Sequence, residues 1–153
     1  MKSEPADCSI DDALAAPDAT VPWTGVRNYQ ARNFMRDAMR VGDGVLFYHS
    51  SCPEPGIAGI ARVASGVRAD PTQFEPASPY YDPKSVPASP RWLLLDVQAL
   101  RKTRLLTLAE LRAHPALADM RVLQRGNRLS ITPVLAQEWT AILHDCLGVS
   151  PHL

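Results

Sequence analysis

The chain has 153 residues, of which 46% are apolar, so its length fits one compact domain with a real core and excludes two such domains. The formal net charge is zero, which excludes the overall basic excess that drives tight, sequence-independent binding to nucleic-acid backbones. No run reaches the roughly 18 to 20 apolar residues of a membrane span, and the acidic start MKSEPADCSIDD lacks the apolar segment of a signal peptide, so we expect a cytoplasmic protein.

Helical and strand patterns alternate along the chain in short segments. Capping boxes at Ser9/Asp12 and Thr107/Glu110 mark two helix starts, and apolar residues at helical spacing mark two further helices. Runs of β-branched and aromatic residues between Pro and Gly mark strands. In chain order we predict a helix over 10–15, a helix over 29–39, strands over 45–50 and 57–67, an irregular loop over 70–90, a strand over 91–102, a short helix after Thr107, a strand over 128–132 and a helix over 133–147.

The distribution of proline and glycine indicates the fold class. Fourteen prolines and eight glycines keep every element short, which argues against a helical bundle. Residues 70–90 hold six prolines and two adjacent tyrosines, and a loop of this length inside a compact domain is usually functional or disordered. We therefore predict an α+β domain built around a small barrel or a strongly bent sheet.

Candidates for catalysis are few. His49, Ser50 and Cys52 bring a base and nucleophiles together at a strand end, but no nucleophile elbow, metalloprotease motif or phosphate loop accompanies them. The three cysteines are odd in number and form no CxxC pair, so we predict reduced thiols and no metal site. We predict no cofactor and no catalytic residue, and keep open an enzyme that acts on a nucleoside-like molecule through His49, Ser50 or Cys52.

Aromatic side chains beside polar runs favour a recognition function. A flat heterocycle gains about 1 to 3 kcal/mol per base by stacking on such rings, while nearby polar groups read its edge. The aromatic residues in this position are Trp23, Tyr29, Tyr48, Tyr80, Tyr81 and Trp92.

Several long motifs together resemble one known family, the EVE domain. They are KSEP at 2–5, WxGVRNYQARNFMR at 23–36, VGDxVLFYHSSCPEPGIAGIARV at 41–63, DPTQF at 70–74, YYDPKS at 80–85, PRWLLLDV at 90–97 and RGNRLSITPV at 125–134. The resemblance implies a single EVE domain over residues 1–150 with the PUA-like fold, a twisted β-barrel of about five to six strands with short flanking helices.

The resemblance also implies a function. EVE domains, like the related YTH readers, are regarded as non-catalytic modules that bind a modified nucleic-acid base in a pocket with aromatic walls. We therefore expect a monomer, away from membranes, that binds DNA or RNA with a modified base in a single strand or flipped out of a duplex. The resemblance implies a base pocket formed by Lys2, Ser3, Glu4, Trp23, Thr24, Gly25, Asn28, Tyr29, Tyr48, His49, Ser50 and Tyr81, and backbone contacts from Lys84, Arg91, Arg125 and Arg128.

Two departures from the family pattern concern the pocket. The family usually has Asp where this chain has Thr24, which changes one group that selects the base edge. Family members also commonly carry an aromatic-Trp-Leu segment before MKSEP, so we expect a truncated first strand or a natural protein a few residues longer. Besides the reader and the enzyme, an interaction module that binds a metabolite or a protein stays open.

Overall fold

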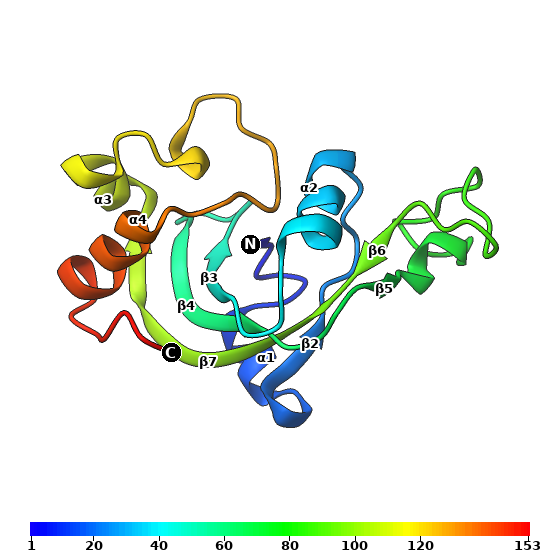
Figure 1. The fold of residues 1–153 in the computed structure, drawn as a ribbon, viewed down its shortest axis with the longest axis horizontal. Helices are drawn as coiled ribbons and strands as arrows, with labels where there is room; N and C mark the ends of the chain where they lie inside the picture. Colours follow the sequence, from blue (N-terminus) through cyan, green and yellow to red (C-terminus); the bar gives the residue numbers. More distant parts are fainter.

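A curled, mixed sheet of five strands in the order β1-β3-β4-β7-β2 organises the fold (Figure 1). The computed structural model describes all 153 residues. β1 runs parallel to β3, whereas all other neighbours in the sheet are antiparallel. The strands are β1 (Lys2–Ser3), β2 (Thr20–Pro22), β3 (Gly44–His49), β4 (Gly56–Val63) and β7 (Asp96–Thr107), and a separate two-stranded sheet pairs β5 (Arg68–Ala69) with β6 (Leu93–Leu94).

Register shifts bend the large sheet into a half-barrel. The pairing of β4 with β7 shifts twice, between Ile57 and Gly59 and between Ile60 and Ala61. β-bulges of this kind bend the strand and increase its twist. The long strand β7 therefore wraps around β3 and β4, as Figure 1 shows.

Both faces of the sheet are covered. Along β3, Val45 and Phe47 belong to one buried cluster, and Leu46 and Tyr48 belong to the other. This alternation follows the two-residue period of a strand. α1 and α2 cover the first face, and α3 and the C-terminal helix cover the second.

The helices are short, and α1, α2 and α3 begin at side-chain caps, whereas α4 begins after Leu135, whose amide donates to the Glu138 carboxylate at 2.8 Å. Ser9 and Thr107 form complete capping boxes, and the Asn28 side chain accepts hydrogen bonds from two backbone N–H groups at the start of α2. α2 and α4 each continue as a π-helical turn. The helices are α1 (Ile10–Ala15), α2 (Tyr29–Asn33, then Phe34–Ala38), α3 (Leu108–Ala113) and α4 (Ala136–Thr140, then Ala141–Cys146), with 3₁₀ turns at Pro17–Ala19, Pro71–Phe74, Pro115–Leu117 and Arg121–Leu123.

The predicted fold class is confirmed, and two predicted strands are wrong. The segment 91–102 is not one strand, because Leu95 separates β6 from β7, which continues to Thr107. The segment 128–132 forms no strand; the Ser130 carbonyl accepts one hydrogen bond from the Lys2 amide at 2.8 Å. The predicted helix over 133–147 begins only at Ala136. No helix of the structure is long and apolar enough to cross a membrane.

The loop over 70–90 forms an ordered lobe beside the sheet (Figure 1). Gln73 is fully buried at its centre, and its amide Nε2 donates to the carbonyls of Asp70 and Trp92 at 2.7 and 2.8 Å. Its Oε1 accepts from the Ser85 hydroxyl and the Trp92 amide. One buried side chain thus replaces the backbone hydrogen bonds that this proline-rich segment cannot make.

Candidate functional site

A cavity of about 980 Å³ opens between the start of the chain, the loop that joins β2 to α2, the turn after β3 and residues Pro79 and Tyr80 of the lobe. Seven predicted pocket residues line it: Lys2, Ser3, Glu4, Trp23, Thr24, Gly25 and Ser50. Of the predicted backbone contacts, Arg128 also lines it. The structure therefore brings together residues that lie more than a hundred positions apart in the sequence.

The start of the chain forms one wall because β1 is held on both sides. Ser3 pairs with His49 of β3, and its carbonyl accepts from the Ser50 amide at 2.9 Å. The Lys2 amide donates to Ser130 on the other side. The Lys2 ammonium has no hydrogen bond or ion pair within the protein, and burial lowers its pKa from 10.5. Its three N–H donors are free to bind an anionic or carbonyl-bearing ligand.

Trp23 forms a second wall and is part of the hydrophobic core at the same time. Its side chain is 7% exposed, and its indole meets the Phe47 ring edge-on with centroids 5.3 Å apart. Its amide donates to Leu95 at 2.9 Å, which fixes the loop on the sheet. The indole N–H has no acceptor in the protein. Since no side-chain nitrogen without a partner is fully buried, this N–H is accessible from outside the protein. The N–H of Trp23 is therefore available to a ligand, as is the Thr24 hydroxyl, which makes no hydrogen bond.

Gly25 and Tyr80 form the third wall in very close contact. Gly25 has φ +82°, and a Cβ placed on it would lie 2.6 Å from Cζ of the Tyr80 ring. Only glycine fits this backbone conformation and this approach. The Gly25 amide donates to the buried carboxylate of Asp70 at 2.9 Å. The lobe thus supplies both the ring that faces the loop and the acceptor that holds the loop.

Asp70 stays ionised although its side chain is fully buried. Burial raises the pKa of its carboxyl, but hydrogen bonds from Thr72, Gly25 and Arg27 outweigh this effect, so that the pKa lies below 3.8. Both Thr72 groups, the amide and the hydroxyl, donate to Oδ1, while Gly25 and Arg27 donate to Oδ2. A carboxylate with four donors is a rigid anchor.

Five predicted pocket residues do not line the cavity. Asn28 caps α2, and Tyr48 is 6% exposed in the buried cluster on the second face of the sheet. Tyr29 stacks on Trp92 with ring centroids 4.7 Å apart. Tyr81, which the family resemblance also placed in the pocket, is 42% exposed outside the cavity. Its neighbour Tyr80 lines the cavity instead.

His49, the fifth, is engaged elsewhere. Its Nε2 accepts a hydrogen bond from the Ile10 amide at 3.1 Å, and burial lowers the pKa of the imidazole from 6.5. This nitrogen must therefore be unprotonated, with its lone pair directed at α1. No hydrogen bond links the His49 side chain to Ser50 or Cys52.

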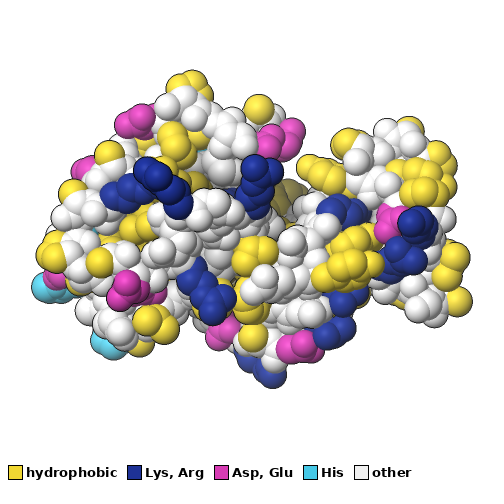
Figure 2. All heavy atoms as spheres, turned by 90° about the horizontal axis from the view of Figure 1, so that it is seen from above, with side chains coloured by type: hydrophobic (Ala, Val, Ile, Leu, Met, Phe, Trp, Pro, Cys, Tyr) yellow, Lys and Arg dark blue, Asp and Glu magenta, His cyan; other side chains and the backbone are white.

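The remaining predicted backbone contacts, Lys84, Arg91 and Arg125, lie outside the cavity lining. Arg91 approaches the Asp82 carboxylate at 4.0 Å. On the face seen in Figure 2, Lys and Arg side chains are spread among acidic and hydrophobic ones, and a hollow separates the lobe from the rest of the molecule. This face lacks the continuous basic patch that dominates non-specific DNA binding.

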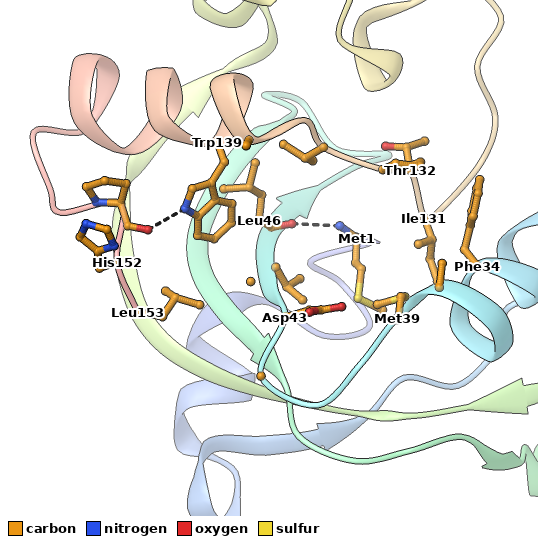
Figure 3. Close-up of a pocket in the computed structure, with 18 residues that line it drawn as sticks. Met1, Phe34, Met39, Asp43, Leu46, Ile131, Thr132, Trp139, His152 and Leu153 are labelled. Carbon is orange, nitrogen blue, oxygen red and sulfur yellow. Dashed lines mark hydrogen bonds between the residues drawn. The ribbon is translucent and has the colours of Figure 1, made fainter.

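A second cavity, of about 730 Å³, lies beside Met1 and the beginning of β3 (Figure 3). It is lined mainly by apolar side chains, among them Phe34, Met39 and Ile131. The indole N–H of Trp139 is already used there, since it donates to the Pro151 carbonyl at 2.8 Å. The first cavity, with its free ammonium, indole and hydroxyl groups, is the better candidate for a polar ligand.

Comparison with known proteins connects this fold and cavity to a family. The sequence model of the EVE domain matches residues 1–145. Human thymocyte nuclear protein 1 is 45% identical in an alignment 161 residues long that covers 94% of this chain and 71% of that protein. An uncharacterised protein of Schizosaccharomyces pombe is 44% identical over 123 residues, which cover 78% of this chain and 51% of that protein.

Solved structures show the same fold. A crystal structure of a Pseudomonas putida protein aligns with a TM-score of 0.88 at 45% identity, over 93% of this chain and 94% of the other. The crystal structure of human THYN1 protein in complex with 5-methylcytosine-containing DNA aligns with a TM-score of 0.87 at 42% identity, over 93% of this chain and 92% of the other. The name of the human relative refers to the nucleus, whereas the sequence led us to expect the cytoplasm.

Proposed function

The chain belongs to the EVE domain family, and on this basis we propose that it is a non-catalytic module that binds DNA carrying a modified base, with 5-methylcytosine as the ligand of choice. The observation that carries the proposal is the crystal structure of a relative with the same fold, human THYN1, in complex with 5-methylcytosine-containing DNA. The cavity beside β1 is the proposed base site. We further propose that residues 1–150 act as one domain and that the protein binds as a monomer.

The chemistry of the cavity suits one unstacked base. Trp23 and Tyr80 present aromatic groups on two walls, and stacking on such groups is sequence-tolerant. The free indole N–H of Trp23 and the Lys2 ammonium are donors that match carbonyl or ring-nitrogen acceptors of cytosine. The Thr24 hydroxyl both donates and accepts, so it can serve the amino group of the base.

Physical limits follow from this site. A base inside a duplex cannot enter the cavity, so the target nucleotide must be single-stranded or flipped, which costs a few kcal/mol. Burying one extra methyl group contributes roughly 0.8 kcal/mol, equivalent to about a fourfold preference. We therefore expect modest discrimination for the methyl group alone.

Titration by fluorescence anisotropy tests the proposal. The probes are matched oligonucleotides with one cytosine or one 5-methylcytosine, as single strands and as duplexes with a mismatch at that position. Wild-type protein should bind the methylated probe more tightly than the unmethylated one, both as a single strand and as a mismatched duplex. Equal binding of methylated and unmethylated probes in both forms would refute the proposal.

The Lys84→Ala and Lys2→Ala variants form a matched pair for locating the site. Both lose one lysine, but only Lys2 lines the cavity. Lys2→Ala should weaken binding of the methylated strand several-fold, because the free ammonium is lost. If Lys84→Ala caused the same loss and Lys2→Ala did not, the base site would lie on the lobe instead.

A further inference from the structure

Arg27, which does not line the cavity, joins the two segments that form its walls. Its Nε donates to the Tyr80 carbonyl at 2.9 Å, and its Nη1 donates to the Asp70 carboxylate at 3.0 Å. Nη1 also donates to the Val26 carbonyl at 2.9 Å, and Nη2 donates to the Thr72 hydroxyl at 3.0 Å. The side chain is 21% exposed. One guanidinium thus connects the loop before α2 with both ends of the segment 70–80.

The same guanidinium lies beside two aromatic rings. Its Cζ is 5.5 Å from the centroid of the Tyr80 ring and 5.6 Å from that of Trp92. Trp92 stacks in turn on Tyr29. Cations at such distances are attracted to the ring faces. Tyr80 is therefore held twice by Arg27, through its carbonyl and through its ring.

Asp70 closes the link to the other wall. The oxygen that accepts from Arg27, Oδ2, also accepts from the Gly25 amide. Gly25 is the residue against which the Tyr80 ring lies. One carboxylate oxygen of Asp70 therefore holds both the loop that carries Gly25 and the Arg27 guanidinium that holds Tyr80. Arg27 contacts neither the cavity nor, on the proposed function, the base.

We propose that Arg27 is a positioning residue that fixes the Tyr80 ring against Gly25 and thereby sets the shape of the base cavity. This inference rests on the proposed function of the cavity. It predicts that the planar fork of the guanidinium is required, because a lysine ammonium keeps the charge but cannot serve the Tyr80 carbonyl, Asp70 and Thr72 together.

The test uses Arg27→Lys, with Arg36→Lys as the matched control, because Arg36 forms an exposed ion pair with Asp37 at 2.8 Å. Arg27→Lys should lower the affinity for the methylated single strand several-fold, because the Tyr80 ring is no longer fixed against Gly25. It should also reduce the preference for 5-methylcytosine over cytosine. Arg36→Lys should change neither.

A double-mutant cycle separates positioning from general destabilisation. If Arg27 acts through the Tyr80 ring, Arg27→Lys should cause almost no further loss of affinity in a Tyr80→Ala background. Additive losses would overturn the proposal. Should Arg27→Lys fail to fold, Thr72→Val replaces it, since it removes a hydroxyl bonded to both Arg27 and Asp70 and should show the same non-additivity.

Amide hydrogen exchange distinguishes failure of this inference from failure of the proposed function. In the free protein, the Gly25 amide should exchange faster in Arg27→Lys than in wild type or Arg36→Lys, whatever the ligand is. Wild-type protein without preference for 5-methylcytosine would refute the function and leave this result to decide the positioning role. Unchanged Gly25 exchange together with unchanged affinity in Arg27→Lys would refute the positioning role.

Discussion

Replacing Gly25 by alanine tests the contact between the two walls of the cavity. The added Cβ would lie 2.6, 2.8 and 2.9 Å from three atoms of the Tyr80 ring, whereas ordinary contact begins at 3.4 Å. The ring must therefore retreat by about 0.8 Å. It cannot do so freely, because Arg27 holds the Tyr80 carbonyl at 2.9 Å.

Two separate costs add up in this variant. An L-residue in the left-handed region loses roughly 1 to 2 kcal/mol, and overpacking adds about 1 to 3 kcal/mol. Gly42→Ala is the matched control, because Gly42 has φ +93° and nothing within 4 Å of a Cβ. It carries the first cost without the second. The difference between the two variants isolates the contact with Tyr80.

Urea unfolding and anisotropy titration measure the two consequences. Gly25→Ala should be less stable than Gly42→Ala by about 1 kcal/mol or more, and its affinity for the methylated strand should fall while that of Gly42→Ala is kept. If both variants lost the same stability and both bound like wild type, the ring of Tyr80 would not be held against Gly25, and the reasoning would be refuted.

Four further outcomes are expected. Trp23→Ala should lower the free energy of unfolding, measured by urea unfolding, by about 3 to 5 kcal/mol, because Trp23 is only 7% exposed. Trp23→Phe, measured in the same assay, should retain most of the wild-type stability. Tyr80→Ala should weaken binding of the methylated strand in an anisotropy titration, whereas Tyr81→Ala should not. The pKa of Asp70 is lowered, so its contribution to stability is fully present above its ordinary pKa of 3.8 and is lost as the pH falls through the lowered value; acid titrations followed by circular dichroism should show a shallower loss in Asp70→Asn. In titrations at several salt concentrations, the logarithm of the binding constant for the methylated strand should fall only gently with the logarithm of the salt concentration, as for a few phosphate contacts. A steep slope would show that phosphate contacts dominate.

The elements that the sequence predicts correctly are those fixed by neighbouring residues. The capping boxes at Ser9 and Thr107 place α1 and α3, since both partners of each box lie within one turn. The break at Leu95 between β6 and β7 has no local signal, because the apolar run continues through it. β1 has only two residues and owes its place to pairing with β3, too short a segment for any periodicity.

The candidate cavity shows the same division. Trp23, Thr24 and Gly25, which line it, were expected together from a loop motif and a family resemblance. Tyr80 could not be separated from Tyr81, because nothing local tells which of two adjacent rings turns toward a loop that lies 55 residues earlier. Asp70 holds Gly25 across 45 residues, and its place at the start of the predicted irregular loop over 70–90 gives no sign of this partner.

The two aromatic walls of the cavity differ in how they are held, and on the proposed function this difference bears on selectivity. Trp23 is packed on Phe47 in the core, so a change there alters stability together with binding. The lobe that contains Tyr80 projects from the sheet (Figure 1). Tyr80 is tied to the loop by polar contacts of Arg27 and Asp70. Polar contacts can be altered without opening the core. We therefore expect that substitutions which change the preferred modification, while keeping the fold, lie on the Tyr80 side of the cavity.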